Sequence, residues 1–452
     1  MSGSILILNR WPQYPDSERW DNKLARYGDI IPHDRYRLTY ICDPPGRQGV
    51  LAGSGGGGPA IRIHLVPDFA DIDRLAGVVK RLIETDGPFD HVIGLSEYLL
   101  DVAAQLRERC GIPGPRPAYV DRFRDKTVMK TILRKAGVPT PRWFPCESPE
   151  QVLAVSEALG FPLIVKPVRG ASSKDVSKVN DPAELEAVLE RIGRNDRTMR
   201  GFEIEEYIAG EVLHADGVVD RSGACLFMSV SRYISPCLDF EAGAPLGSII
   251  QTEPALYDRC RHFALRCLAA LDLRASAFHL EFFDTGRDLV FLEIGARVPG
   301  ADVSYVIHDV YGVNLFKLWV DVVLGHEVKP VDCRSSVGGQ SGGWVTIPRP
   351  QPLPQTVLRA TPLLGKIPFL YRELVPRPGQ MLEDAGGGYA NLQGGRFLFG
   401  GGTESQIAEA IHAAIDAYEL TTEPATIAAS PTTTAETTTT ATATAATAAL
   451  AQ

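Results

Sequence analysis

The sequence lacks the features that mark several classes of protein. It has no basic excess, since 46 Lys and Arg stand against 55 Asp and Glu, for a formal net charge of −9. We therefore expect no nucleic-acid partner, and any anionic ligand must meet local positive charge. The apolar run nearest the N-terminus is only Ile5–Leu8, and no later run reaches the length of a membrane span. We expect neither a secretion signal nor a membrane partner.

The sequence also lacks any organised pattern of cysteines. The eight cysteines are scattered and form neither a CxxC pair nor a Cys/His cluster at zinc spacing; they are Cys42, Cys110, Cys146, Cys225, Cys237, Cys260, Cys267 and Cys333. This pattern indicates reduced thiols and predicts a cytoplasmic location. The hydrophobic share of 44% is that of a globular protein, and 452 residues predict two to four domains.

Strand-like and helix-like segments alternate in the first part of the chain. Expected strands cover residues 5–8, 36–42, 61–66 and 91–95, and expected helices cover residues 71–84 and 97–110. This alternation predicts a doubly wound, mostly parallel sheet with helices on its faces, in a domain over residues 1–117. The GSGGGG at 53–58 matches GxGxxG, but a strand follows it instead of a helix. We interpret it as a flexible loop and not as a dinucleotide site.

The C-terminal part is predicted to hold a mostly β extension over residues 331–420 and a tail. The extension ends in a helix that begins with the capping pattern Thr403 to Gln406. Residues 421–452 are mainly Thr and Ala, with few charges or large apolar side chains. Such a segment cannot bury enough surface to offset the entropy of ordering, so we expect it to be disordered.

Two acidic residues interrupt an apolar hairpin between these ends. Residues 278–283 and 289–294 are short aromatic runs around a turn centred on Arg287, which predicts two antiparallel strands with Glu281 opposite Glu293. Alternation along the strands places His279, Phe283 and Phe291 on the same face. A slip of one residue would move one Glu to the other face.

The predicted pairing of Glu281 with Glu293 is costly in a buried site. At about 5 Å and an effective dielectric of about 20, two carboxylates repel by roughly 3 kcal/mol. We infer that a positive group lies between them. The alternative is a water-facing hairpin, where the repulsion falls below about 1 kcal/mol.

Several further polar residues lie where expected strands or helices end. Lys166 ends the apolar run 161–167, and the loop 169–175 is rich in donors that can wrap phosphates. The main chain of 203–212 could meet an adenine edge, with Glu211 accepting from ribose hydroxyls. Lys126 starts a helix, where a cation opposes the helix dipole. Taken singly, Lys166 is better explained as a solvated strand end, and a surface turn explains the loop equally well. Residues 203–212 are by themselves only a charged strand end, and Lys126, the weakest signal, is explained by a surface charge.

Taken in order, these features resemble the ATP-grasp superfamily over roughly residues 118–328. The matching motifs are DK (125–126), LIVKP (163–167) with the loop after it, EEYIAGE (205–211), HLEFF (279–283) and LEIGAR (292–297). The segments GVPTP (137–141), LEIGARVPG (292–300) and GGWVTIPRP (342–350) look most like the L-amino acid ligase group. The resemblance implies two α+β lobes over residues 118–330, with a mobile lid at about 127–200.

The resemblance also implies roles for individual residues. ATP would be held by Lys126, Lys166, Gly170, Ser172, Ser173, Glu205, Glu206, Ile208 and Glu211. Mg²⁺, with Mn²⁺ as an alternative, would bind Glu281 and Glu293, which supplies the positive charge missing from the hairpin. Arg297 would contact the transferring phosphoryl group, with Lys166 as the second catalytic cation. Many relatives carry Asn where this chain has Gly295, so the number of ions stays open.

The implied function is an ATP-dependent carboxylate–amine ligase that forms an amide through an acyl phosphate and releases ADP and phosphate. The expected partners are small-molecule carboxylates and amines, with amino acids foremost, and a homodimer is the assembly to test. Two alternatives stay open: an ATP-grasp carboxylase or carboxylate–thiol ligase, and a regulatory protein that binds ATP without turnover.

Overall fold

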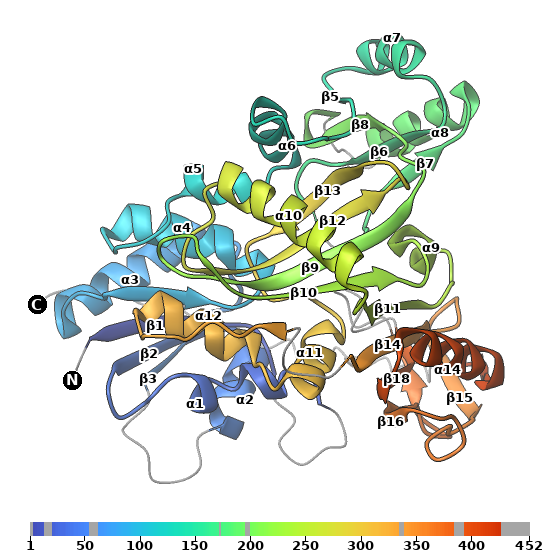
Figure 1. The fold of residues 1–452 in the computed structure, drawn as a ribbon. Coiled ribbons are helices and arrows are strands. Elements are labelled where there is room, and N and C mark those ends of the chain that lie inside the picture. The colour runs from blue at the N-terminus through green and yellow to red at the C-terminus, as the bar shows by residue number, and fades with distance from the viewer. Residues whose placement is uncertain are drawn as a thin grey trace, which may run out of the picture.

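The computed structural model describes residues 3–12, 20–53, 62–170, 173–194, 199–333, 339–383 and 393–425. The chain forms an N-terminal α/β domain, a small lobe that stands above it, and a long sheet that continues into the C-terminal part (Figure 1). None of the helices in these ranges is both long and apolar enough to cross a membrane.

The N-terminal domain is the predicted parallel sheet. Its strands are β1 (Ser4–Asn9), β2 (Arg37–Cys42), β3 (Arg62–Leu65) and β4 (His91–Gly94), in the order β3-β2-β1-β4. Its helices are α1 (Tyr27–Ile30), α2 (Pro44–Gly53), α3 (Ile72–Asp86) and α4 (Glu97–Cys110). Leu6 and Leu8 pack in one core with α3 and α4, and Ile5 and Ile7 pack in another. Both faces are therefore covered, which explains why the residues from Ile5 to Leu8 in β1 are all apolar.

The GSGGGG segment falls largely outside the described residues. Its first residue, Gly53, ends helix α2, and residues 54–58 are not described. A helix at 44–53 was not predicted, although Pro44 is a residue type that favours the first helical turn.

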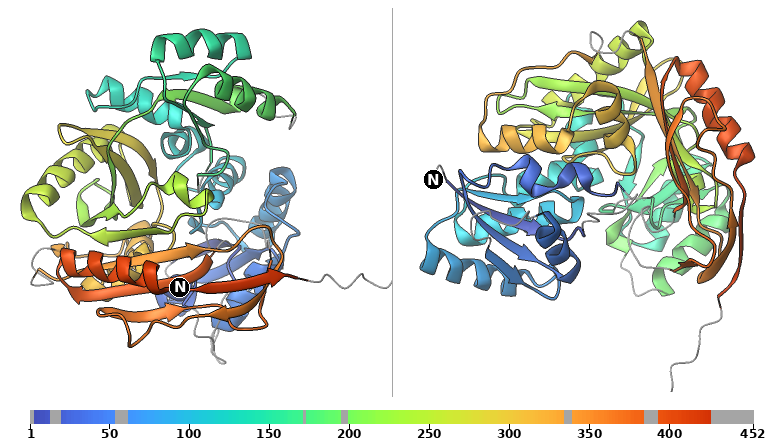
Figure 2. Two further views of the ribbon diagram at one scale, coloured as in Figure 1. Left: turned by 90° about the vertical axis from the view of Figure 1, so that its right-hand side faces the viewer. Right: turned by 90° about the horizontal axis from the view of Figure 1, so that it is seen from below.

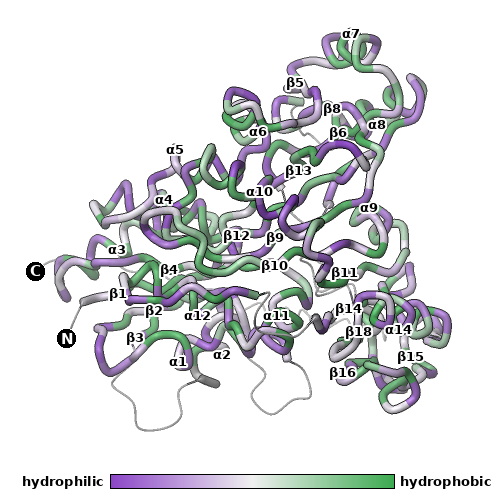
Figure 3. Tube along the Cα trace, in the orientation of Figure 1, coloured by the Kyte–Doolittle hydropathy of each residue, from purple (hydrophilic) through white to green (hydrophobic). Residues whose placement is uncertain are grey.

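The small lobe is a four-stranded antiparallel sheet covered by two helices. Its strands are β5 (Trp143–Pro145), β6 (Leu163–Pro167), β7 (Ser177–Val179) and β8 (Phe202–Glu206), in the order β5-β8-β6-β7. Helices α7 (Pro149–Leu159) and α8 (Pro182–Arg194) bury Val152, Leu185 and Leu189 against the sheet. Hydrophobic and hydrophilic residues alternate along both helices, as expected for helices with one buried face (Figure 3). Helix α6 (Lys126–Lys135) leads into this lobe.

One eight-stranded sheet joins the second domain to the C-terminal part. Its order is β13-β12-β9-β10-β11-β14-β18-β16. These strands are β9 (Glu211–Val219), β10 (Cys225–Tyr233), β11 (Leu246–Ile250), β12 (Ser276–Asp284), β13 (Leu289–Gly295), β14 (Ser341–Pro348), β16 (Leu370–Leu374) and β18 (Gln393–Gly402). Because β11 pairs with β14, the sheet runs across the boundary predicted near residue 330.

Several of the remaining helices cover this sheet, and a smaller sheet flanks the large one. The helices are α5 (Pro117–Val120), α9 (Cys237–Glu241), α10 (Pro254–Ala270), α11 (Val303–Tyr311), α12 (Leu315–Leu324) and α14 (Glu404–Ala417), and 3-10 turns lie at Lys23–Ala25, Asp121–Phe123 and Met199–Gly201. Of these helices, α5 packs on α4. Helix α14 lies across the C-terminal strands (Figure 2, left) and begins with the predicted capping box of Thr403 and Gln406.

The predicted start of the tail at residue 421 was wrong by about one strand. Strand β19 (Leu420–Pro424) pairs with β15 (Gln355–Ala360), which also pairs with β17 (Met381–Leu382). Thr421 and Thr422 are β-branched and pair well as strand residues, so composition alone misplaced the boundary. Residues 426–452, the remainder of the predicted tail, lie outside the described part of the chain.

Candidate functional site

The hairpin of β12 and β13 has the predicted register at its two acidic residues. Glu281 pairs with Glu293, and the register shifts directly after this pair. Because of this β-bulge, Phe291 pairs with Phe282 instead of Phe283, and both paired rings are fully buried. The prediction that Phe291 shares a face with Glu281 was therefore wrong. The bulge turns Leu292 and Glu293 together toward a cavity.

This cavity of about 270 Å³ lies between the small lobe and the large sheet. It brings together most of the residues predicted from the sequence: Lys126, Lys166, Gly170, Ser173, Glu205, Glu206, Ile208, Glu281 and Glu293. Arg297 and Glu211 are not among the residues that line it, and Ser172 lies outside the described residues. Additional lining comes from Cys237 to Asp239 in α9 and from Lys174 and Lys178.

Each carboxylate of the facing pair already has a cationic neighbour. Lys126 Nζ lies 3.0 Å from Glu293 Oε2, and His279 Nε2 lies 3.3 Å from Glu281 Oε1. Burial would raise the pKa of Glu293, but Lys126, Lys166 and Arg297 outweigh it and lower that pKa to about 2. The expectation that a positive group compensates the pair is met by side chains, so the pairing alone does not require a metal ion.

A buried ion-pair cluster lies beneath the lysine at the end of β6. Lys166 Nζ is 2.5 Å from Glu205 Oε1, and Lys130 Nζ is 2.6 Å from Glu205 Oε2 and 2.7 Å from Glu203 Oε1. Lys130, Lys166 and the two glutamates are all buried. Burial raises the pKa of Glu203, whereas for Glu205 the two lysines outweigh burial and lower it. The Glu205 side chain therefore belongs to this cluster, and Glu206 instead pairs with Arg142.

Lys130 was missed in the sequence, although a signal was present. It stands four residues after Lys126 on α6, and this spacing places both lysines on one face of the helix. Both are buried, which is unusual for lysines without partners.

A second buried network supports Glu281. Asp216 contacts two histidines. Its Oδ2 lies 2.6 Å from Nδ1 of His214, and its Oδ1 lies 2.6 Å from Nδ1 of His279. The Tyr233 hydroxyl donates to Glu281 Oε1 at 2.8 Å. Burial would lower the pKa of His279, but Asp216 and Glu281 raise it to about 10. The network thus presents Glu281 to the cavity in a fixed position.

The strand register explains how this network assembles. Strands β9 and β12 pair so that His279 is opposite Asp216 and Glu281 is opposite His214. The sequence signal was the alternation of His214 and Asp216 in an otherwise apolar strand, EVLHADGVV. From the sequence, His279 is a lone histidine of the kind that more often serves packing, and its contact with Asp216 follows from the pairing of β9 with β12.

Arg297 is held from the N-terminal domain. Its Nε lies 2.6 Å from Oε2 of Glu97, the first residue of α4, and Glu97 also pairs with Arg124. A Cβ on Gly295 would lie 3.3 Å from Arg297 Cγ, so the glycine leaves room for this side chain to turn toward Glu97. Nothing in the spacing of the sequence indicates an ion pair between residues 200 positions apart.

The remaining predicted ligand, Glu211, lies at the exposed start of β9. Its Oε2 is 3.1 Å from Arg232 Nη1. Its role toward a ribose stays a prediction, as do the individual roles of the other residues.

Comparison with known proteins agrees with this arrangement. A family model described as the ATP-grasp domain matches residues 159–304, which run from the strand of Lys166 past Glu293 and Arg297. The chain therefore carries an ATP-grasp domain. The predicted fold class, with an N-terminal parallel sheet before this domain, is confirmed.

The relatives refine the comparison. The L-arginine-specific L-amino acid ligase of Bacillus subtilis is 25% identical over 268 residues, which are 57% of this chain and 63% of that protein. A D-alanine--D-alanine ligase of Bacillus anthracis is 32% identical over 152 residues, 32% of this chain and 48% of that protein. The chain thus spans less than two thirds of either relative. The crystal structure of an L-amino acid ligase from Bacillus licheniformis aligns with a TM-score of 0.66 at 20% identity, covering 93% of this chain and 98% of that one.

Proposed function

We propose that the protein is an ATP-dependent ligase that joins a carboxylate to an amine, with amino acids as substrates. The observation that carries this proposal is the cavity in which two facing glutamates of the large sheet meet Lys126 and Lys166. This set provides cations for phosphates on one side and oxygen ligands for a metal ion on the other. The L-amino acid ligases among the similar proteins favour this reaction over others.

The lysines are placed so that they can exchange partners. Lys126 and Lys166 now pair with Glu293 and Glu205, and both would turn to ATP phosphates when the nucleotide enters. Lys130 would stay with Glu205, so that this buried carboxylate keeps a counter-charge. Departure of Lys126 would free Glu293 for another cation at the moment the triphosphate arrives.

The donor set fits a magnesium site. Glu281 and Glu293 supply carboxylate oxygens, which Mg²⁺ prefers, and Gly295 adds no ligand. A protein with two carboxylates leaves the remaining positions to phosphates and water, as is usual for Mg²⁺ bound with a nucleotide. When bound there, the ion would neutralise charge on the transferring phosphoryl group.

In the proposed reaction, an oxygen of the substrate carboxylate attacks the γ-phosphorus of ATP, and the bond to ADP breaks. The amine nitrogen then attacks the acyl carbon of the acyl phosphate, the C–N bond forms as the acyl C–O bond breaks, and phosphate leaves with the proton that the nitrogen gives up. This chemistry depends mainly on positioning and charge stabilisation. Arg297, fixed by Glu97, would stabilise negative charge on the phosphoryl group as its bonds change.

Closure of the small lobe would complete the site. Lys166, Gly170 and Ser173 belong to that lobe, whereas Glu281 and Glu293 belong to the large sheet. Movement of one lobe against the other would enclose ATP and protect an acyl phosphate from water.

Product analysis tests the proposal. The protein is incubated with ATP, MgCl₂ and pooled amino acids, ADP is measured, and products are identified by mass. We expect ADP together with a new amide, and ¹⁸O from a labelled carboxylate in the released phosphate. A carboxylated product or a thioester would show that the acceptor is not an amine. ATP binding without ADP release from any mixture would indicate a regulatory protein.

A further inference from the structure

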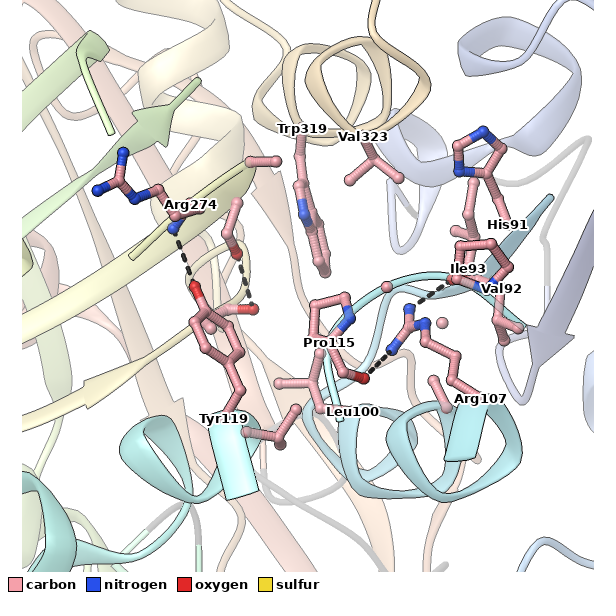
Figure 4. A pocket seen from close by; sticks show the side chains of 18 of the residues that line it. His91, Val92, Ile93, Leu100, Arg107, Pro115, Tyr119, Arg274, Trp319 and Val323 are labelled. Atoms are coloured by element: carbon pink, nitrogen blue, oxygen red, sulfur yellow. Dashed lines mark hydrogen bonds between the residues drawn. The ribbon is translucent and has the colours of Figure 1, made fainter. Parts of the chain in front are cut away.

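A second cavity, of about 320 Å³, lies where the N-terminal domain meets the large sheet. Figure 4 shows its walls: Trp319 and Val323 of α12 on one side, Leu100 and Arg107 of α4 opposite them, and Tyr119 of α5 at one end. The strand residues His91, Val92 and Ile93 of β4 close the other end. Ligand pockets begin at roughly 300 Å³, so the cavity suits a small molecule.

This cavity is separate from the proposed ATP site. It reaches β12 at Ser276, five residues before Glu281, which is a distance of about 16 Å along an extended strand. The residues that line the two cavities do not overlap.

Arg107 is one of the charged residues that line this cavity. Its Nη2 donates to the Val92 carbonyl at 2.7 Å, and its Nη1 lies 3.4 Å from the Pro115 carbonyl. A guanidinium has five N–H donors, so three are left without a partner among the described residues. Among the described residues, no carboxylate forms an ion pair with the half-buried Arg107. Asp90, the acidic residue of the lining, accepts instead from the backbone N–H of Ser4.

The electrostatics of Arg107 agree with a missing anion. Burial, together with the positive charge of Arg116, lowers the pKa of Arg107 to about 10. Arg221, another lining residue, donates only to the Val322 and Val323 carbonyls among the described residues. The lining thus has one carboxylate, Asp90, against Arg107, Arg221 and Arg274. A bound carboxylate would offset part of the remaining positive charge, and arginine binds a carboxylate through two parallel hydrogen bonds.

We propose that this cavity binds a small aromatic monocarboxylate, with its ring against Trp319 and Leu100 and its carboxylate on Arg107. An aromatic body fits because Tyr119, Phe123 and Trp319 supply rings to the wall. A dianion or a phosphate would leave charge facing apolar side chains. The proposal does not depend on the reaction catalysed, since binding is measured without ATP.

The cavity also lies behind the residues that hold Arg297. Its lining includes Ala296, the residue before Arg297, and Leu95, two residues before Glu97. A bound molecule would therefore touch both segments that carry the Glu97–Arg297 ion pair. Occupancy would fix the N-terminal domain against the large sheet.

Calorimetry on the full chain tests the proposal. The probes are phenylacetate, 3-phenylpropionate and indole-3-acetate, each compared with its neutral amide. We expect at least one acid to bind with a 1:1 ratio and a Kd of about 1 mM or tighter, and its amide to bind at least about tenfold more weakly. Failure of all three acids to bind at about 10 mM, or equal binding of acid and amide, would overturn the proposal.

Three variants locate the binding site. Arg107→Met removes the charge and Val323→Trp fills the cavity while leaving Arg107 in place, so each is expected to weaken binding at least about tenfold. Arg109→Met is the matched control, because Arg109 is on the same helix but pairs with Asp73 on the other side. Should one of the first two variants fail to fold, the other decides the matter. Undiminished binding to whichever of these variants folds would place the acid elsewhere and refute the assignment.

Discussion

Two buried polar clusters face each other across the proposed ATP site, and they are built differently. On the small lobe, Lys130 and Lys166 hold Glu205 through long, flexible side chains. On the large sheet, His214, Asp216 and His279 support Glu281 through short side chains fixed on paired strands. In the first cluster, Lys130 would keep Glu205 paired if Lys166 turned to a phosphate, whereas in the second Glu281 is held by side chains of adjacent paired strands.

This difference matches the ligands that we propose for the two sides. Phosphates enter and leave in every turnover and move with the lobe, so mobile lysines suit them. A metal ion needs oxygen ligands held in a defined geometry, which rigid hydrogen-bonded supports provide. The site thus combines an adaptable side with a fixed side.

Removal of the Glu293 carboxylate on the large sheet is expected to have the largest effect on catalysis. Glu293→Gln takes away a proposed metal ligand and the counter-charge of Lys126. We expect the rate of ADP formation to fall by about 10³-fold or more, which corresponds to about 4 kcal/mol. A coupled ADP assay measures the rate, and circular dichroism at the assay temperature verifies that the variant is folded. Activity close to that of the unmodified protein would refute the metal assignment.

Substitutions of Lys130 and Lys166 are expected to have different effects. The first should mainly lower the stability of the fold, and the second should mainly weaken ATP binding. Lys130→Met leaves Glu203 with only Lys166, whose Nζ is 3.8 Å from Glu203 Oε1, and removes one of the two cations from Glu205. The free energy of unfolding should therefore fall by about 3–5 kcal/mol. Lys166→Met leaves Lys130 in place, so its stability loss should be smaller while the KM for ATP rises. Denaturant unfolding and ATP titration measure the two effects. Equal losses of stability in both variants would contradict the view that Lys130 alone anchors the cluster.

The stability that His279 contributes on the fixed side is expected to depend on pH. The pKa of His279 is raised in the folded state to about 10, above its ordinary value of about 6.5. The stability that it contributes is therefore complete below about pH 6.5 and is lost as the pH rises toward 10. Asp216→Asn removes the main cause of this shift. Unfolding curves between pH 6 and 10 should show a steeper loss of stability for the unmodified protein than for the variant, and parallel curves would count against a charged His279.

Local sequence signals were sufficient for much of the fold. The strand and helix alternation gave the parallel sheet, and the expected helix at residues 97–110 coincides with α4. The capping pattern at Thr403 and the facing pair of Glu281 and Glu293 are also confirmed. In each of these cases, the residues that determine the structure are close together in the chain.

What could not be predicted depends on contacts between distant segments. The bulge after Glu281 reversed the face of Phe291, and it arises from how β13 fits its surroundings. Glu97 and Arg297 meet only because two domains pack together. The continuation of the large sheet into β14 likewise follows from tertiary pairing and not from composition.

The smallest expected effect concerns the exposed Glu211 at the edge of the site. It pairs with Arg232 in the structure, at the start of β9. If it accepts from the ribose hydroxyls, Glu211→Gln should raise the KM for ATP about three- to tenfold with little change in kcat, since one charged hydrogen bond contributes about 1 kcal/mol at an exposed site. Comparison of ATP with 2′-deoxy-ATP sharpens the test, because the variant should lose most of the discrimination between them. Arg232→Gln is the matched control: it removes the partner of Glu211 but not the acceptor, and should leave that discrimination in place. An unchanged KM and unchanged discrimination in Glu211→Gln would show that the adaptable side holds the nucleotide through its lysines and main chain, without this carboxylate.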